Sequence, residues 1–154
     1  DLMPRPQPAR LLLPALALAL LAACSAEVPD IHPDKPVTQR RDAFKALLRS
    51  SEPMGTMIAD RRFDPGAFAR LAEGLVAVRD KPWGHFGPDT DYPPTKARRA
   101  VWEKPAEFER RRADFIAATE RVLAAAAARS EGDARTAVAA LQDSCKACHR
   151  EFRK

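Results

Sequence analysis

The stretch Cys145-Lys146-Ala147-Cys148-His149 decides how the rest of this 154-residue chain is interpreted. C-x-x-C-H is the pattern of c-type haem attachment, in which two thiols add to the porphyrin vinyl groups and the imidazole becomes an axial iron ligand. Residues three and four apart lie on one face of a helix, so both thiols and the imidazole can meet one edge of a flat ring. We therefore expect one covalent haem c, attached at Cys145 and Cys148, with His149 as an axial iron ligand.

Other sites that use closely spaced cysteines fit the sequence less well. A thioredoxin-like C-x-x-C follows a strand and opens a helix, whereas this motif closes a helical stretch. A zinc site needs four ligands, and outside the motif only Cys24, His32 and His85 remain among the cysteines and histidines. A disulfide within the motif would be strained and would leave its histidine without a role.

The N-terminal segment has the features of a secretory signal. Two arginines precede the apolar run 11–23, which is shorter than the roughly 20 residues needed to span a bilayer. The run leads into Leu-Ala-Ala-Cys at residues 21–24, which resembles the lipobox of bacterial lipoproteins. That resemblance implies lipidation of Cys24, and Ser25 after it implies an outer-membrane anchor facing the periplasm. Ordinary signal cleavage nearby, with an incidental cysteine, is the alternative.

The charge pattern argues against nucleic acid as a partner. The formal net charge is +5, but the basic residues are interspersed with acidic ones rather than clustered as an arm. Removal of Asp1, Arg5 and Arg10 with the signal would lower the formal charge to +4. We expect a mixed, solvated surface.

Four stretches have apolar residues at helical spacing: 37–60, 64–79, 105–129 and the stretch from Gly132 through the C-x-x-C-H motif. Short links within the first and last pairs favour antiparallel neighbours. The sequence therefore predicts an all-α fold, an antiparallel up-down-up-down four-helix bundle with covalently bound haem. The link 80–104 is long, which often marks a functional loop.

We divide the chain into a signal peptide (1–23), a lipidated N-terminus with a Pro-rich tether (24–36) and a helical haem domain (37–154). His32 lies in the tether and is expected to have no role. Pro53 is expected to kink or break the first helix.

This topology places the motif beside the start of the first helix and beside the 80–104 link. The link carries four ring-bearing residues: Trp83, His85, Phe86 and Tyr92. Phe44 is the nearest apolar residue of the first helix. Met54 and Met57 lie about 15–20 Å further along it at 1.5 Å per residue, too far to ligate the iron, so we expect them to fill the core.

With C-x-x-C-H closing a four-helix sequence, the chain resembles the cytochrome c′ family over most of 37–154. The features that carry the resemblance are Arg40 to Leu47, Pro82-Trp83, Phe86-Gly87-Pro88, Val101-Trp102 with Phe108, Ser144 to His149, and Phe152-Arg153-Lys154.

The resemblance implies a role for several residues. His149 would be the proximal ligand, with Arg153 near its solvent-facing side. Arg40 would lie near the haem edge and its propionates, and the distal position four residues later is Phe44. The haem pocket would also include Trp83 and Phe86. A shifted register of the first helix would offer Leu47 or Leu48 instead, and none of the three can ligate iron. The resemblance therefore implies five-coordinate, high-spin iron.

A distal face without hydrogen-bond donors does little for bound O₂ and favours NO and CO. The leading hypothesis is a gas-binding haem protein that buffers or scavenges NO and is also capable of electron transfer. The resemblance adds that NO can bind on the proximal side by displacing His149, and that the first two helices form a homodimer.

Two other hypotheses remain. One is a low-spin electron-transfer cytochrome with His85 as its sixth ligand and an unidentified redox partner, to which the positive charge would steer it. The other is peroxidase-type catalysis, which normally needs a distal acid–base group that Phe44 does not supply. We therefore expect a protein that is not an enzyme.

Overall fold

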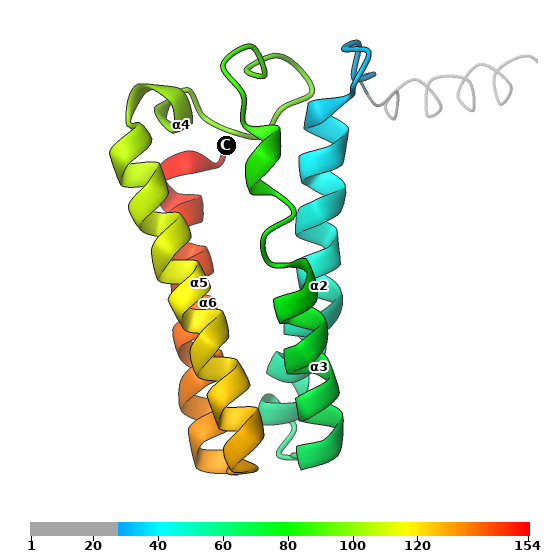
Figure 1. Cartoon of the computed structure of the whole chain (residues 1–154), viewed down its shortest axis with the longest axis vertical. Coiled ribbons are helices and arrows are strands. Elements are labelled where there is room, and N and C mark those ends of the chain that lie inside the picture. The colour runs from blue at the N-terminus through cyan, green and yellow to red at the C-terminus, as the bar shows by residue number, and fades with distance from the viewer. Residues whose placement is uncertain (1–27) are drawn as a thin grey trace, which may run out of the picture.

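The computed structural model describes residues 28–154, and its architecture is a bundle of four long helices. These are α2 (Pro36–Ala59), α3 (Pro65–Val78), α5 (Pro105–Ala128) and α6 (Glu131–Phe152). Each packs against two neighbours, so that α2 contacts α3 and α6 while α5 contacts α3 and α6 (Figure 1). The predicted antiparallel up-down-up-down bundle is confirmed.

Local sequence explains where the helices begin. Proline opens α2, α3 and α5, where its fixed φ and missing N–H cost nothing. The Asp64 side chain accepts a hydrogen bond from Ala67 N at 2.6 Å, and Ser130 accepts one from Asp133 N at 3.2 Å. The predicted starts of all four helices are correct to within one residue.

Pro53 does not interrupt the first helix. The α2 helix runs without a break from Pro36 to Ala59, so the expectation of a break was wrong. Pro53 lies on the exposed side of the helix, where the carbonyl group that loses its N–H partner can be hydrated. The orientation of the proline, which its presence in the sequence does not reveal, decides this outcome.

The hydrophobic core is packed most tightly toward the end of the bundle where α2 meets α3 and α5 meets α6 through short turns. Met54, Phe68, Leu75 and Val122 are completely buried. Buried alanines line the facing sides of α5 and α6: Ala118, Ala125, Ala126, Ala134 and Ala137. Their small side chains allow the two backbones to approach closely. Met54 is thus a core residue, as its position predicted.

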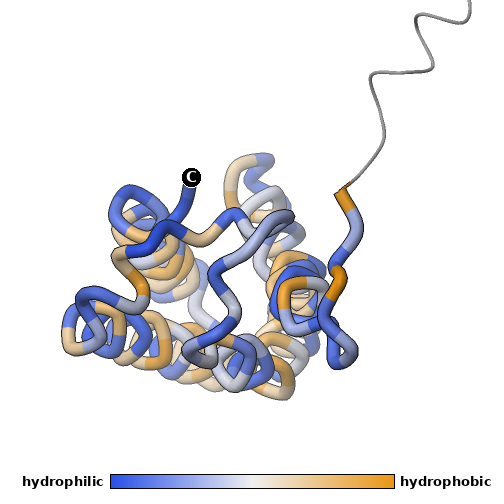
Figure 2. The backbone as a smooth tube through the Cα atoms, turned by 90° about the horizontal axis from the view of Figure 1, so that it is seen from above, coloured by the Kyte–Doolittle hydropathy of each residue, from blue (hydrophilic) through white to orange (hydrophobic). Residues whose placement is uncertain are grey.

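The opposite end of the bundle is closed by the connection between α3 and α5. This connection contains a 3₁₀ turn, η1 (Trp83–His85), and a short helix, α4 (Ala100–Glu103), which was not predicted. It passes over the helix ends (Figure 2). We call residues 28–42, 79–104 and 145–154 the motif end, because the C-x-x-C-H motif lies there.

The connection is joined to the end of α6 by backbone hydrogen bonds. Ala97 and Arg153 form an isolated antiparallel bridge. Arg98 N donates to Phe152 O and Lys154 N donates to Lys96 O, both at 2.8 Å. We call this the C-terminal bridge. It prevents the residues that follow the motif from fraying.

The segment before α2 is docked onto the connection. Tyr92 Oη donates to Asp30 Oδ1 at 2.5 Å, and Thr38 N donates to Asp30 Oδ2 at 2.8 Å. The His32 ring stacks on Tyr92 with centroids 6.4 Å apart. We call this set of contacts the Asp30–Tyr92 latch. The described part of the predicted tether is therefore held against the domain, and the His32 ring takes part in this contact.

The two titrating groups of the latch have shifted pKa values. Burial alone would raise the pKa of Asp30, but hydrogen bonds from Tyr92 and Thr38 outweigh it and lower the pKa to about 2. Burial and the bond to Asp30 raise the pKa of Tyr92 to about 12. Asp30 therefore stays ionised and Tyr92 stays protonated, as this hydrogen bond requires, at any pH between the ordinary pKa values of the two groups.

Within the part of the chain that the structure describes, no helix combines the length and apolarity that crossing a membrane requires. The apolar run 11–23 lies outside the described residues.

Burial predicts unequal costs for the same substitution at two leucines. Leu75 is fully buried, whereas Leu48 is 46% exposed. We expect Leu75→Ala to lower the free energy of unfolding by about 2–5 kcal/mol and Leu48→Ala by less than about 1 kcal/mol. Chemical unfolding followed by far-ultraviolet circular dichroism at one protein concentration measures both. Equal costs would contradict this description of the core.

Candidate haem site

The three residues of the motif lie on the last two turns of α6, at the motif end. Cys145 and Cys148 are half-buried and unpaired, and His149 is exposed. Among residues 28–154, no three His, Cys, Asp or Glu side chains are grouped closely enough to hold a metal ion. The two thiols and the imidazole are instead spread along one helical turn, an arrangement that suits attachment to the edge of a macrocycle.

Burial shifts the pKa values of all three groups. It raises the pKa of Cys145, and burial together with the neighbouring Cys145 thiol raises the pKa of Cys148 to about 11. Burial and the Arg153 guanidinium lower the pKa of His149. At neutral pH the thiols are protonated and the imidazole is neutral, which is the form that coordinates a metal.

A cluster of aromatic rings fills the interior next to the motif. Its seven members come from every long helix except α3 and from the connection: Phe44, Trp83, Phe86, Trp102, Phe108, Phe115 and Phe152. Neighbouring ring centroids are 5.0–6.5 Å apart. We call it the aromatic cluster. Five of the seven rings are only partly buried, unlike the residues of the core at the other end.

Phe44 is the residue of α2 that enters this cluster. Its ring lies 5.7 Å from Trp83 and 6.3 Å from Phe86, measured between centroids. Leu47 is buried in the helical core, and the Leu48 side chain is 46% exposed. Phe44 thus contacts two of the other expected pocket residues, Trp83 and Phe86.

The polar atoms of the two indole rings are already bonded. Trp83 Nε1 donates to Arg79 O at 2.8 Å, and Trp102 Nε1 donates to Gly87 O at 2.9 Å. Both acceptors are backbone carbonyls. The cluster therefore presents apolar ring surfaces, and its indole N–H groups are not available to another acceptor.

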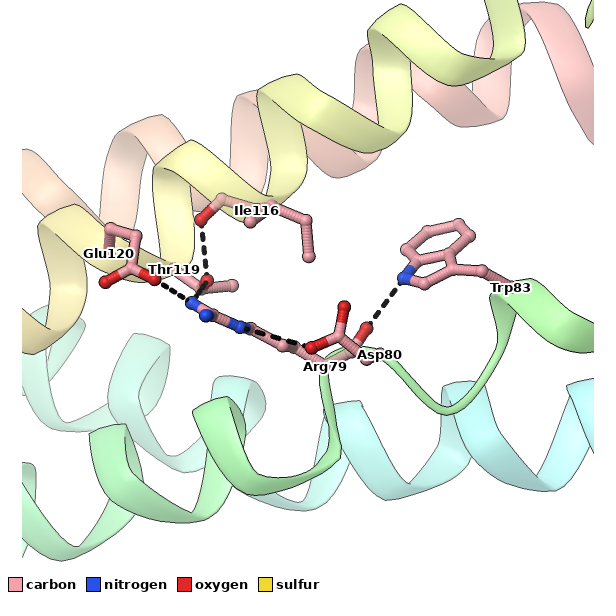
Figure 3. A network of polar contacts seen from close by, with 6 residues as sticks. All are labelled: Arg79, Asp80, Trp83, Ile116, Thr119 and Glu120. Atoms are coloured by element: carbon pink, nitrogen blue, oxygen red, sulfur yellow. Dashed lines mark hydrogen bonds and ion pairs between the residues drawn. The ribbon is translucent and has the colours of Figure 1, made fainter.

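Trp83 is held in place by a polar network that ties the end of α3 to α5 (Figure 3). Arg79 donates to Thr119 Oγ1 at 3.0 Å and also to Glu120 Oε1. The Arg112 guanidinium carbon lies 5.9 Å from the centroid of the Trp83 ring. The backbone and side chain of Arg79 together fix the position of the indole.

Arg40 is buried at the motif end and joins α2 to the connection. Its side chain is 4% exposed. Nη1 donates to His85 O at 3.1 Å and to Thr90 Oγ1 at 3.0 Å. Nη2 donates to Thr90 O at 2.9 Å and to Thr95 Oγ1. We call this set of bonds the Arg40 clamp.

The Arg40 guanidinium also lies 5.0 Å from the Phe86 ring centroid and 5.7 Å from that of Trp102. Among the described residues no carboxylate pairs with it, and burial lowers its pKa. The resemblance placed Arg40 near the haem propionates. The structure places Arg40 at the motif end, where Nη1 and Nη2 donate four hydrogen bonds to residues of the connection.

Two further residues from the sequence-based site lie at this end. Arg153 is exposed and forms part of the C-terminal bridge, close enough to His149 to affect the pKa of its imidazole. His85 is the last residue of η1, and its carbonyl oxygen accepts a bond from Arg40. Cys24 lies outside the described residues.

The residues present fit a covalent haem. The motif supplies two thiols and a neutral imidazole from one helical turn, and the cluster beside it supplies partly exposed aromatic surfaces. A flat apolar group with two attachment points and one metal to ligate matches both features.

Sequence reasoning missed several residues of this site. Thr90, Thr95 and Asp30 have no motif around them, and Arg79 was assigned only as a helix end. A signal was present for the threonines. A buried arginine without a carboxylate needs several neutral acceptors, and the link beside it contains two threonines.

The Arg40 clamp predicts the effect of a conservative change. Lysine carries one charged nitrogen and cannot replace four bonds in a planar fork. We expect Arg40→Lys to lower the free energy of unfolding by at least about 2 kcal/mol and to speed amide hydrogen exchange across residues 85–95. Arg49→Lys, an exposed change on the same helix, is the matched control. Equal exchange in the two variants would show that Arg40 does not hold the connection.

Known proteins match the chain over most of its length. The family model described as Cytochrome C' matches residues 35–153. Cytochrome c′ of Alcaligenes xylosoxydans xylosoxydans is 28% identical over 123 residues, which cover 79% of this chain and 95% of that protein.

Solved structures match as well. The crystal structure of cytochrome c′ from Rubrivivax gelatinosus has a TM-score of 0.76 at 26% identity and covers 82% of this chain and 100% of that one. The nitric oxide complex of a Leu-to-Ala mutant of cytochrome c prime from Alcaligenes xylosoxidans has a TM-score of 0.75 at 27% identity, and the match covers 80% of this chain and 97% of that one. A carbon monoxide-bound Leu-to-Gly variant of cytochrome c prime from Alcaligenes xylosoxidans has a TM-score of 0.75 at 27% identity, and the match covers 82% of this chain and 99% of that one. The chain belongs to the cytochrome c′ family, whose members carry one covalently bound haem c.

Proposed function

We propose that this chain is a periplasmic haem protein that binds NO and CO at five-coordinate, high-spin iron and buffers or scavenges NO. Cys145 and Cys148 attach the haem, and His149 is the one protein ligand of the iron. The observation that carries this proposal is the position of Phe44 in the aromatic cluster. A phenyl ring in the distal position cannot ligate iron and cannot donate a hydrogen bond.

The haem supplies an iron that can bind a diatomic gas, and the surrounding side chains set which gas is favoured. Bound O₂ develops negative charge and gains from a nearby donor, whereas NO and CO need less help. The indole N–H groups of Trp83 and Trp102 are bonded to backbone carbonyls. The four terminal N–H bonds of Arg40 are directed to the connection. This supports discrimination against O₂.

The proximal side is shaped by His149 and Arg153. Because burial and the Arg153 charge lower the pKa of His149, the imidazole stays neutral and able to coordinate at physiological pH. The same positive charge disfavours protonation of the imidazole whenever it is not bound to a metal, so His149 would stay in the form that can coordinate the haem iron.

We propose the cellular setting from the sequence. Residues 1–23 act as a lipoprotein signal, Cys24 carries the lipid anchor, and residues 24–36 link the anchor to the haem domain 37–154. Anchoring in the outer membrane places the domain in the periplasm. The solved structures with bound NO and CO concern relatives of this chain, and they support the same ligands here.

Electron transfer is a second part of the proposal. The half-buried attachment cysteines and the exposed His149 support a position of the haem near the protein surface. It would exchange electrons there with a redox partner that is still unidentified. We propose no catalysis, because peroxidase chemistry needs a distal acid–base group and Phe44 supplies none.

We also propose that α2 and α3 form a homodimer interface. A shallow groove of about 580 Å³ runs along the outer side of α2, lined in part by Leu48, Pro53 and Met57. Leu48 is one of the exposed large apolar residues of the described chain. A second copy would cover this groove.

The gas preference predicts a spectroscopic result. We expect the ferrous protein to show a five-coordinate, high-spin absorption spectrum that changes with NO and CO and not with O₂, and the ferric protein to show a high-spin electron paramagnetic resonance signal. We expect His85→Ala to leave the resting spectrum unchanged. A low-spin, six-coordinate resting spectrum that becomes high-spin in His85→Ala would favour the alternative, an electron-transfer cytochrome ligated by His85.

The distal assignment predicts a gain of ligation. We expect Phe44→Met to convert the iron to a six-coordinate, low-spin form, because a thioether in that position is a common axial ligand. Leu48→Met should leave the spectrum unchanged, since residue 48 faces solvent. Absorption spectra of the two variants in both redox states decide the point. A low-spin spectrum from Leu48→Met alone would move the distal position to residue 48.

A further inference from the structure

Cationic side chains gather around the C-terminal bridge. Five of them are exposed and form no ion pair with any described residue: Lys96, Arg98, Arg150, Arg153 and Lys154. The bridge brings them together, since Ala97 pairs with Arg153 and Lys154 N donates to Lys96 O. Arg98 Nη1 also donates to Arg150 O at 3.2 Å. We call these five residues the basic patch.

The opposite end of the bundle is electrically balanced. Residues 60–64 and 129–135 contain four acidic and four basic side chains: Asp60, Asp64, Glu131 and Asp133 against Arg61, Arg62, Arg129 and Arg135. Two ion pairs form among them, Arg62 with Asp60 at 2.9 Å and Arg135 with Glu131 at 2.8 Å. The excess of positive charge is therefore confined to the motif end.

The N-terminal segment leaves the domain at the same end. The first described residues lie at this end, beside the start of α2 (Figure 1). The Asp30–Tyr92 latch holds residue 30 against the connection. Val28 and Ile31 beside it are 53% and 80% exposed, and they are two of the three exposed large apolar residues in the described chain. Exposed apolar side chains and a basic patch at the same end of a domain suit the boundary between lipid headgroups and acyl chains.

The length of chain before the latch limits how the domain can be turned. Cys24 and Asp30 are six positions apart, so the chain between them spans at most about 22 Å. The 24 residues of α2 are about 36 Å long at 1.5 Å per residue. A lipid anchor at Cys24 therefore cannot reach past the far end of the bundle while the latch is closed.

We propose that the motif end is the face held against an anionic phospholipid surface, with the latch setting the direction and the basic patch making the contact. The proposal rests on the lipid anchor proposed above. Phospholipid headgroups attract each nearby Lys or Arg, and the attraction fades within a Debye length. The haem site then opens toward the membrane rather than away from it.

Orientation can be measured on the purified, haem-loaded and lipidated chain in vesicles. With Cys24, Cys145 and Cys148 occupied, an introduced cysteine is the one free thiol for a nitroxide label. Asp89→Cys labels the motif end and Asp133→Cys the far end, and both positions are exposed. The readout is the gain in nitroxide relaxation when a gadolinium-chelating lipid is added to phosphatidylcholine vesicles containing phosphatidylglycerol. We expect a several-fold larger gain at residue 89.

Two sets of variants test the latch and the basic patch separately. Asp30→Ala removes the acceptor of the latch and should reduce the difference between the two labels. The triple change Lys96→Gln, Arg98→Gln and Lys154→Gln should do so as well, and it leaves the two arginines next to His149 in place. Arg49→Gln, Arg70→Gln and Arg121→Gln remove the same charge from exposed positions elsewhere and should change nothing.

Failure of the inference is distinguishable from failure of the anchor. Mass spectrometry of the Cys24 peptide tests lipidation alone. If no lipid is found, binding of the unlabelled, haem-loaded protein to phosphatidylglycerol vesicles still tests the motif end, and absence of binding overturns the inference. With the lipid present, equal gains at both labels overturn it. A patch variant that behaves like its control assigns the cations to another partner, such as an acidic protein, and also overturns it.

Discussion

The burial of one positive charge organises the motif end of this molecule. Arg40 has no carboxylate partner in the described chain, so its guanidinium must be satisfied by neutral groups. Those groups lie on the connection between α3 and α5, which has little regular structure of its own. By binding them, Arg40 converts a long loop into a fixed cap on the bundle. The positions of Phe86 and Trp102, over which the guanidinium lies, follow from the same contact.

The two ends of the bundle have different roles. One end is packed to completion around Phe68 and Leu75 and supplies stability. The other end holds large rings that are only partly buried, together with polar groups whose hydrogen bonds are already directed to the backbone. An apolar surface whose nearby donors are already hydrogen-bonded suits a small uncharged ligand, because such a ligand needs no hydrogen bond.

Helical periodicity was sufficient to predict the four helices, their order and the end at which the motif lies, since apolar spacing and proline starts are local signals. It also placed Met54 in the core and Phe44 beside the connection. The rest depended on contacts between distant residues. Pro53 faces outward and does not break α2, Asp30 bonds to Tyr92 across 62 positions, and Arg40 bonds to Thr90 across 50. No single stretch of sequence records such pairs, because their geometry exists only once the bundle has assembled.

The C-terminal bridge has a practical consequence for handling the protein. Lys154 is joined by its backbone to residue 96, and the described chain also begins at this end. An affinity tag or fluorescent protein fused after Lys154 would extend a segment that pairs with the cap and would crowd the region around His149. The turns near residues 61 and 129 lie at the other end of the bundle, remote from this contact. Those two turns are the places where a fused domain or a peptide epitope can be carried without touching the haem region.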